Sequence, residues 1–269
     1  MNGPDRDLAA GTLSRRLLLA GGIMIALRSA EVLAQTTAQA FVESLYRPYL
    51  DAGFQGQPYG DTGRFFAPAL AQAMDRERVN DEANKGFATL ADGPFAPGVM
   101  GFVEEPGRPA YDPEAARKAV EALKAEGVDM SIRILSTIDP SVIRSTLLAV
   151  EMLREVGFEV ELETELQEDL IDRVLAGDFQ SAAFRNQPGH DPYITYLWWY
   201  GAGNPVNFAR FDDPVINEAL DKGRSEPDPE KRRSYYETIH KRMATEVYYS
   251  YQWYVPWAVV EAPNVHGIL

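Results

Sequence analysis

The fold is decided by residues 130–185, which read MSIRILSTIDPSVIRSTLLAVEMLREVGFEVELETELQEDLIDRVLAGDFQSAAFR. Three short segments, beginning at Met130, Phe158 and Phe179, have the alternation and length of strands. Two segments between them have the apolar spacing and capping of helices, at 139–157 and 166–177. The order strand, helix, strand, helix, strand predicts an α/β fold with a mostly parallel sheet flanked by helices and right-handed crossovers.

Aspartate–proline pairs mark the starts of four predicted helices. The aspartate side chain can accept hydrogen bonds from the free N–H groups of the first turn, and proline loses nothing at the first helical position. The pairs are Asp112-Pro113, Asp139-Pro140, Asp213-Pro214 and Asp228-Pro229. The last two pairs predict tandem helices within residues 211–243.

The remaining segments carry weaker patterns. We predict a short amphipathic helix at 38–50, a glycine- and aromatic-rich loop at 51–66, and one helix at 68–86. Residues 248–269 are aromatic and predicted to be mainly β-strand. On such a strand Tyr249, Tyr251 and Trp253 would share one face.

Composition excludes several kinds of site. The chain has 269 residues, no cysteine and a formal net charge of -14. Disulfides, thiolate metal sites and cysteine nucleophiles are therefore excluded, and nucleic acid is a disfavoured partner. The three histidines are far apart and lack metal-ligand spacing. We expect no metal, no cofactor and no nucleic-acid partner.

The N-terminal residues have the pattern of an export signal. Ser14, Arg15 and Arg16 precede an apolar run, 17–27, which is shorter than the roughly 20 residues of a membrane span. This pattern resembles a twin-arginine signal, and we expect cleavage after Ala34. The alternative is an arginine pair before a buried helix, which two adjacent glycines in the apolar run disfavour.

Several segments in sequence order resemble one family. They are residues 73–98 (with the Gly-Pro-Phe-x-Pro-Gly loop), 111–122, 174–179, 207–243 and 262–269. From about Ala73 onward the chain resembles the extracytoplasmic solute-binding proteins of ABC importers, in the peptide/nickel (oligopeptide-binding) family.

The resemblance implies an arrangement of three parts. Residues 1–34 would be the signal, 35–72 a short helical and loop segment of unknown origin, and 73–269 a periplasmic-binding-protein-like C-terminal lobe. The N-terminal lobe of the family would be largely missing, as in a truncated or fused protein.

The resemblance also implies a function. The chain would be the substrate-binding component of an ABC transporter for peptides or similar small solutes. Its partners would be the ligand, the ABC permease and, during export to the periplasm, the twin-arginine translocase. It would not be an enzyme, and no G-x-S-x-G nucleophile motif favours a hydrolase. The alternative is an exported, non-enzymatic interaction module that pairs through its aromatic C-terminal strands.

The resemblance places the ligand cleft in the loop after the third strand. Arg185 and Asn186 stand where the family often has a tryptophan and an acidic residue. Arg185 would pair with a ligand carboxylate, or else be a solvated strand end. Asp191 would pair with a ligand ammonium group, or else cap the next helix.

Aromatic residues and one amide complete the expected site. Trp198 and Trp199 would form an aromatic wall, although adjacent helical residues point about 100° apart, so that at least one should be core. Asn207 and Phe208 match the family's Asn-Phe loop. Asn207 would either bind the ligand or hold the turn.

Overall fold

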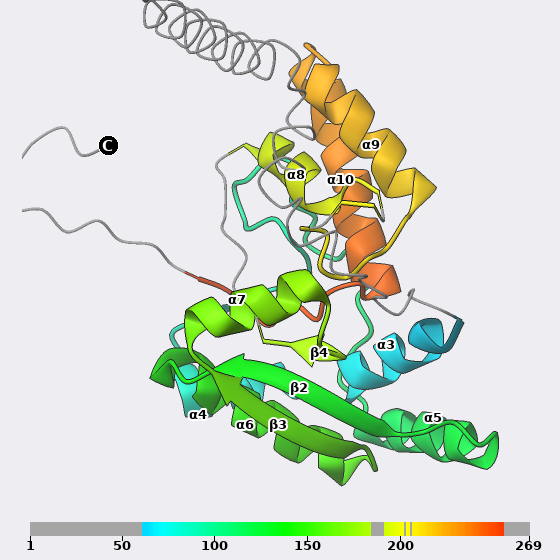
Figure 1. Cartoon of the computed structure of the whole chain (residues 1–269). Coiled ribbons are helices and arrows are strands. Elements are labelled where there is room, and N and C mark those ends of the chain that lie inside the picture. Colours follow the sequence, from blue (N-terminus) through cyan, green and yellow to red (C-terminus); the bar gives the residue numbers. More distant parts are fainter. Residues whose placement is uncertain (1–60, 184–190, 202, 205, 256–269) are drawn as a thin grey trace, which may run out of the picture. The chain divides into compact units, whose positions relative to one another are not determined.

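Three parallel strands form the central sheet, in the order β3-β2-β4 (Figure 1). They are β2 (Ser131–Thr137), β3 (Glu159–Glu165) and β4 (Ser181–Ala182). The computed structural model describes residues 61–183, 191–201, 203–204 and 206–255, without the side chains of 61–66. The export signal and the helix expected at 38–50 lie outside these residues. The predicted α/β fold is confirmed, although β4 is shorter than the expected strand at 179–185.

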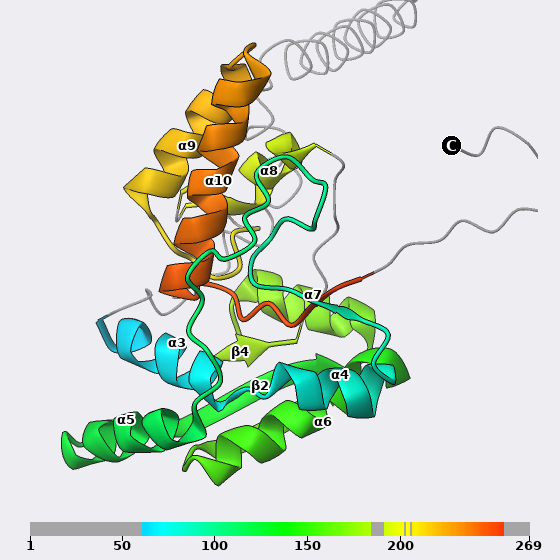
Figure 2. The ribbon, with the colours of Figure 1, turned by 180° about the vertical axis from the view of Figure 1, so that it is seen from behind.

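The two crossover helices lie on opposite faces of the sheet. Helix α6 (Pro140–Glu155) follows β2, and α7 (Gln167–Ala176) follows β3 (Figure 2). The Asp139 side chain caps α6 by accepting from the Ser141 N–H at 2.8 Å. Helix α5 (Pro113–Ala125) joins α6 on its face. Apolar side chains of these two helices and of the sheet form one core, which includes Val120, Leu123, Ile134, Val150, Leu153 and Val160.

Two helices stand where one was expected at 68–86. They are α3 (Asp61–Ala73) and α4 (Arg76–Asn84). The single-helix prediction is wrong because Asp75 is extended and accepts from the Arg78 N–H at 2.9 Å, which starts a new helix. Helix α3 also begins inside the expected loop at 51–66. It crosses the expected boundary at residue 72. Its last residue, Ala73, belongs to the core of the sheet, and Ala67 and Ala71 pack with Val247.

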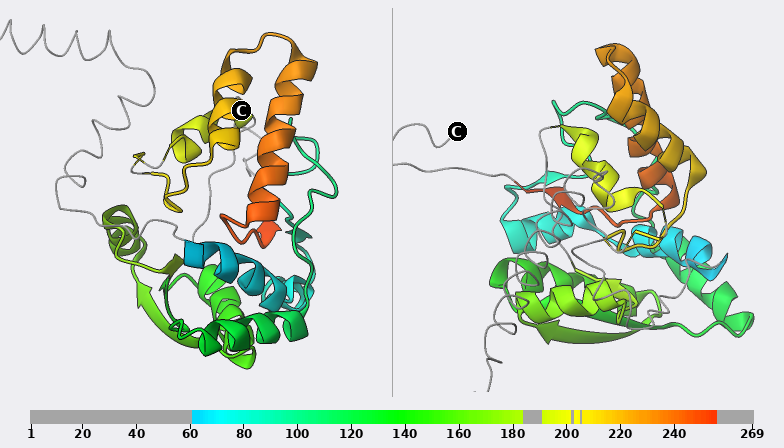
Figure 3. Two further views of the ribbon diagram at one scale, coloured as in Figure 1. Left: turned by 90° about the vertical axis from the view of Figure 1, so that its right-hand side faces the viewer. Right: turned by 45° about the horizontal axis from the view of Figure 1, so that its top comes forward.

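The predicted tandem helices are confirmed as α9 (Pro214–Ser225) and α10 (Pro229–Glu246), which run side by side (Figure 3). Asp213, 2 % exposed, caps α9 by accepting from the N–H groups of Val215 and Ile216. The same carboxylate accepts from Arg242 Nε at 2.6 Å and from the Tyr248 hydroxyl at 2.8 Å. These hydrogen bonds satisfy a buried charge and join the start of α9 to the end of α10.

The loop at residues 91–102 docks closely on α10. A Cβ at Gly93 would lie 2.4 Å from His240 Nε2, and one at Gly101 would lie 2.4 Å from Tyr236 Cβ. Tyr236 and His240 are one helical turn apart and fully buried. Glycine at both loop positions therefore permits the contact between loop and helix.

The aromatic residues after α10 are mostly not in a strand, so the expectation of a β-rich aromatic face is wrong for the described part. Strand β5 covers only Trp253–Tyr254 and pairs antiparallel with β1 (Thr89–Leu90). The Tyr248 ring stacks on Phe211 at 4.4 Å. Left-handed backbone at Val247 ends α10, and the rings that follow pack into the core around α9 and α10.

No helix among the described residues has both the length and the apolar character required to cross a membrane.

Candidate functional site

The strand order defines a topological switch point. From central β2 the chain goes to β3 on one side, and then returns through α7 to β4 on the other side. In open α/β sheets, ligands bind outside the carboxyl ends of strands where the connections diverge in this way. The candidate site is therefore at the carboxyl ends of β2 and β4.

At the end of β2 the structure shows an accessible apolar residue. Ile138 is 53 % exposed, and its N–H donates to Glu165 O at 3.0 Å, which holds its backbone against β3. Buried Thr137 precedes it, and the α6 cap, Asp139, follows it. The sequence-based prediction missed Ile138. The available signal was an apolar residue between a strand and an Asp-Pro helix start.

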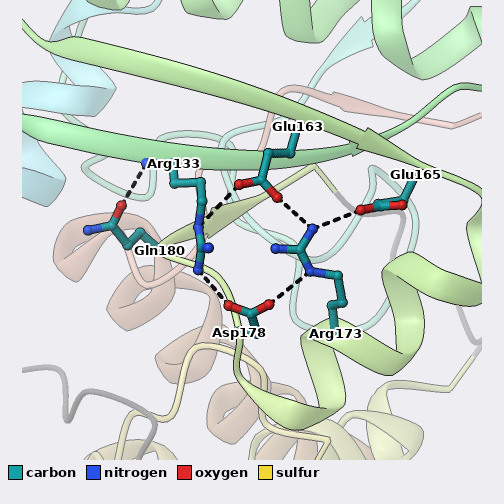
Figure 4. Close-up of polar contacts among 6 residues, drawn as sticks. All are labelled: Arg133, Glu163, Glu165, Arg173, Asp178 and Gln180. Carbon is teal, nitrogen blue, oxygen red and sulfur yellow. Dashed lines mark hydrogen bonds and ion pairs between the residues drawn. The ribbon is translucent and has the colours of Figure 1, made fainter.

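A network of ion pairs holds the segment that leads into β4 (Figure 4). Arg133 on β2 contacts Asp178 at 2.6 Å, and its N–H donates to Gln180 Oε1 at 2.7 Å. Arg173 on α7 contacts Glu163 at 2.5 Å, Glu165 at 2.8 Å and Asp178 at 3.0 Å. The hydrogen bond from Arg133 holds the pKa of Asp178 below its usual value, and the hydrogen bond to Glu163 raises the pKa of Arg173. The network fixes the end of α7 relative to the sheet.

Several residues of the expected site lie outside the described part of the chain. These are Arg185 and Asn186 at the cleft, and Ser14, Arg15 and Arg16 in the export signal. Asp191 is described, and its side chain is 55 % exposed. It accepts from the Tyr193 N–H at 2.9 Å and pairs with Arg232 of α10. The hydrogen bond from Arg232 is the main cause of the lowered pKa of Asp191. The carboxylate therefore acts as a cap and already has a cationic partner.

The two adjacent tryptophans have different environments in α8 (Thr195–Trp199). Trp199 is 1 % exposed and packs against Phe95, with ring centroids 6.2 Å apart. Trp198 is half-buried, and its ring centroid lies 6.2 Å from that of Phe208. The prediction that at least one tryptophan is core is confirmed. Trp198 and Phe208 form the more accessible aromatic pair.

Asn207 holds the turn that carries Phe208. It is fully buried, and its Nδ2 group donates to Gly201 O at 3.1 Å and to Phe211 O at 2.8 Å. Its backbone N–H donates to Asn204 O at 3.0 Å. The contacts of Asn207 therefore agree with the alternative that it holds the turn.

A second surface feature lies at the opposite end of the strands. It is a shallow hollow of about 410 Å³ that reaches Gly177, the residue after α7. Its lining includes Ser131, Arg133, Glu159, Glu161, Phe179 and Gln180. Because it lies at the amino ends of β2 and β3, it is separate from the switch point. Within the described ranges no group of three or more His, Asp or Glu side chains could hold a metal ion.

In an open α/β sheet with a switch point, the carboxyl ends of the strands are the usual place for a ligand. Residues 16–208 match the model of bacterial extracellular solute-binding proteins, family 5 Middle, and the chain belongs to this family.

Curated relatives include the oligopeptide-binding protein OppA of Mycobacterium tuberculosis and of Mycobacterium bovis. Each is 26% identical over 180 residues, which is 62% of this chain and 30% of the relative. The chain thus spans less than a third of the length of these relatives.

Solved structures confirm the fold. The oligopeptide-binding protein AppA of Bacillus subtilis, in complex with a nonapeptide, matches with a TM-score of 0.62 at 16% identity, over 71% of this chain and 41% of that chain. The ABC transporter substrate-binding protein CtaP of Listeria monocytogenes matches with a TM-score of 0.64 at 20% identity, over 78% and 41%. The described residues therefore have the fold of part of a periplasmic binding protein.

Proposed function

We propose that this chain supplies one wall of a solute-binding site and serves an ABC importer of peptides or similar small solutes. The observation that carries the proposal is the switch point at the carboxyl ends of β2 and β4, in a chain that belongs to a solute-binding family. The mechanism is binding without covalent chemistry. Burial of a solute between two lobes would shift an open form to a closed one.

The described residues suggest how the wall is built. Ile138 would supply apolar contact at the end of β2, and Trp198 and Phe208 would supply a second apolar contact, with buried Trp199 and Asn207 next to them in the chain. Arg185 and Asn186 are proposed to reach polar groups of the solute. Asp191 would bind a ligand ammonium group only by exchanging its contact with Arg232, because that pair already satisfies the carboxylate.

The wider arrangement is also a proposal. Residues 73–269 would correspond to the C-terminal lobe, 35–72 to the segment before it, and 1–34 to a twin-arginine signal that directs the protein to the periplasm. The partner in the membrane would be an ABC permease. The membership in an extracellular solute-binding family and the oligopeptide-binding relatives support this arrangement.

One wall cannot enclose a solute, so we expect only weak peptide binding by this chain. Nuclear magnetic resonance titration with a peptide mixture should perturb signals of Ile138, Trp198 and Phe208 at millimolar peptide. Ile138→Asn should remove this response. Leu147→Asn is the matched control, because Leu147 on α6 is also 53 % exposed.

Two results would count against the proposal. Peptide-induced perturbations confined to the amino ends of the strands would argue against a site at the switch point. An equal loss of the response in Ile138→Asn and Leu147→Asn would do the same. Micromolar binding by calorimetry would contradict the one-wall arrangement. Fractionation of expressing cells tests the export signal separately, since Arg15→Lys with Arg16→Lys should retain the protein in the cytoplasm.

The alternative, an interaction module that pairs through aromatic C-terminal strands, gains no support from the described residues. The rings of Tyr248, Tyr249 and Tyr251 pack into the chain's own core, and between residues 248 and 255 only Trp253–Tyr254 forms a strand.

A further inference from the structure

In the described part of the chain, the free side of β3 and the amino half of β2 lack a neighbouring strand, as does the outer side of the two-residue β4. In this part β3 pairs only with β2, and β4 covers only Ile134 and Leu135 of β2. Unpaired edges offer N–H and C=O groups to any extended segment, including that of a second copy. We propose that specific side chains close the free side of β3 and the uncovered part of β2 against pairing with a second copy of the chain.

On β2, side chains replace the missing part of the neighbouring strand. Leu135 O accepts from the Ala183 N–H at 2.8 Å, so odd-numbered residues of β2 direct their backbone groups toward β4. In the part of β2 that β4 does not cover, the Ser131 N–H donates to Asp129 Oδ1 at 2.9 Å. The Arg133 N–H donates to Gln180 Oε1 at 2.7 Å (Figure 4). Another strand would have to displace both acceptors.

On β3, the outward backbone groups belong to even-numbered residues. The Glu159 N–H donates to Met130 O, and Glu165 O accepts from the Ile138 N–H, so odd-numbered residues face β2. The groups of Val160, Leu162 and Thr164 therefore point to the free edge. Arg154, in the last turn of α6, donates to Val160 O at 2.6 Å and occupies one of them.

Charge adds a second barrier at β3. Glu159, Glu161, Glu163 and Glu165 alternate along the strand and share one face. Two copies that pair antiparallel about a two-fold axis at Leu162 would place Glu161 opposite Glu163 and Glu159 opposite Glu165. Any symmetric antiparallel register sets odd residues against odd residues, so glutamates would meet glutamates.

This repulsion is not fully neutralised within the chain. Glu163 and Glu165 contact Arg173, whereas Glu159 and Glu161 are exposed and form no ion pair with the described residues. Like charges directly opposite each other destabilise a strand pair. The amino half of β3 should therefore contribute most of the charge barrier.

The test compares the full chain with E159Q/E161Q, alone and with R154M added. The matched control is E121Q/E126Q, which removes the same charge from exposed positions of α5 and the residue after it. Light scattering coupled to gel filtration should show wild type and control as monomers from micromolar to millimolar concentration. The triple variant should dimerise with a dissociation constant lower by about tenfold or more. Hydrogen exchange should slow at the Leu162 and Thr164 amides only in that dimer.

Several outcomes would overturn the proposal. One is a folded triple variant that stays as monomeric as the control. Another is a wild-type dimer whose Leu162 and Thr164 amides already exchange slowly. If the variants do not fold, the wild-type chain is measured in about 1 M salt. At this concentration the Debye length is about 3 Å, so the repulsion between the glutamates is screened and edge pairing should increase. Unchanged monomer under that condition would also overturn the proposal.

Discussion

Buried His240 should make the stability of this protein depend on pH. The side chain is 0 % exposed, and neither ring nitrogen has a hydrogen-bond partner among the described residues. Its ring centroid lies 5.7 Å from that of Phe95 and 5.8 Å from that of Phe102. Burial lowers the pKa of His240 to about 4, although the charge of nearby Asp92 partly opposes this.

The sign follows from proton binding in the two states. The unfolded chain binds a proton at His240 near the usual pKa of about 6.5, and the folded chain only near 4. As pH falls through this interval, the unfolded state takes up the proton first and stability is lost. A difference of about 2.5 between the two pKa values corresponds to about 3 kcal/mol in total, of which about 2 kcal/mol should be lost between pH 7 and pH 5.

Urea unfolding at several pH values measures this effect. His240→Phe removes the titration and keeps an aromatic ring beside Phe95 and Phe102. The variant's absolute stability can differ, because the loop at Gly93 is close to the ring. The difference between wild type and variant should nevertheless change by about 2 kcal/mol between pH 7 and pH 5. The same pH dependence in both proteins, or a His240 resonance that titrates near pH 6.5, would refute the reasoning.

Three further predictions concern packing and ion pairs. Asp213→Ala removes the α9 cap and the partner of Arg242, so urea unfolding should show a free energy of unfolding lower by about 3 kcal/mol. A decrease below about 1 kcal/mol would contradict the role of this carboxylate. Gly101→Ala should lower the melting temperature more than Gly98→Ala. Both glycines have positive φ, but of the two only Gly101 would bring a Cβ close to another side chain, that of Tyr236. Arg173→Ala should cost about 1 kcal/mol, and high salt should reduce this difference; a difference that does not change with salt would argue against the ion-pair network.

Local patterns were sufficient to predict the core of the fold. Alternation gave β2 and β3, and the Asp-Pro pairs gave the starts of α5, α6, α9 and α10, because strand faces and helix caps depend on neighbouring residues. The break between α3 and α4 was missed because apolar spacing continues through Met74. The extended backbone of Asp75 is fixed by tertiary packing, to which Met152 contributes by accepting from the Asp75 N–H.

The candidate site was less predictable, since burial decides what each side chain can do. Sequence reasoning could state that the two adjacent tryptophans differ, but only packing against Phe95 identifies Trp199 as core. The aromatic segment after α10 misled the strand prediction, because ring packing in the core and β-pairing favour the same residue types. Ile138 was missed because its exposure depends on where β3 and α6 lie.

Long-range arginine contacts were beyond any local pattern, and one of them attaches the turn that carries Phe208 to the end of α7. Arg210 has a left-handed backbone, and its guanidinium donates to Asn204 O at 3.0 Å and to Leu175 O at 3.3 Å. Leu175 lies at the end of α7, where carbonyl groups lack helical partners and favour a cation. The turn that carries Phe208 is thereby attached to the helix that precedes β4. The residue after α7, Gly177, lines the hollow at the amino ends of β2 and β3, so this contact anchors the turn on the amino side of the sheet. The Arg210 contact therefore does not couple the aromatic pair to the carboxyl edge, and a joint response of Ile138, Trp198 and Phe208 to a peptide requires the peptide to contact both places.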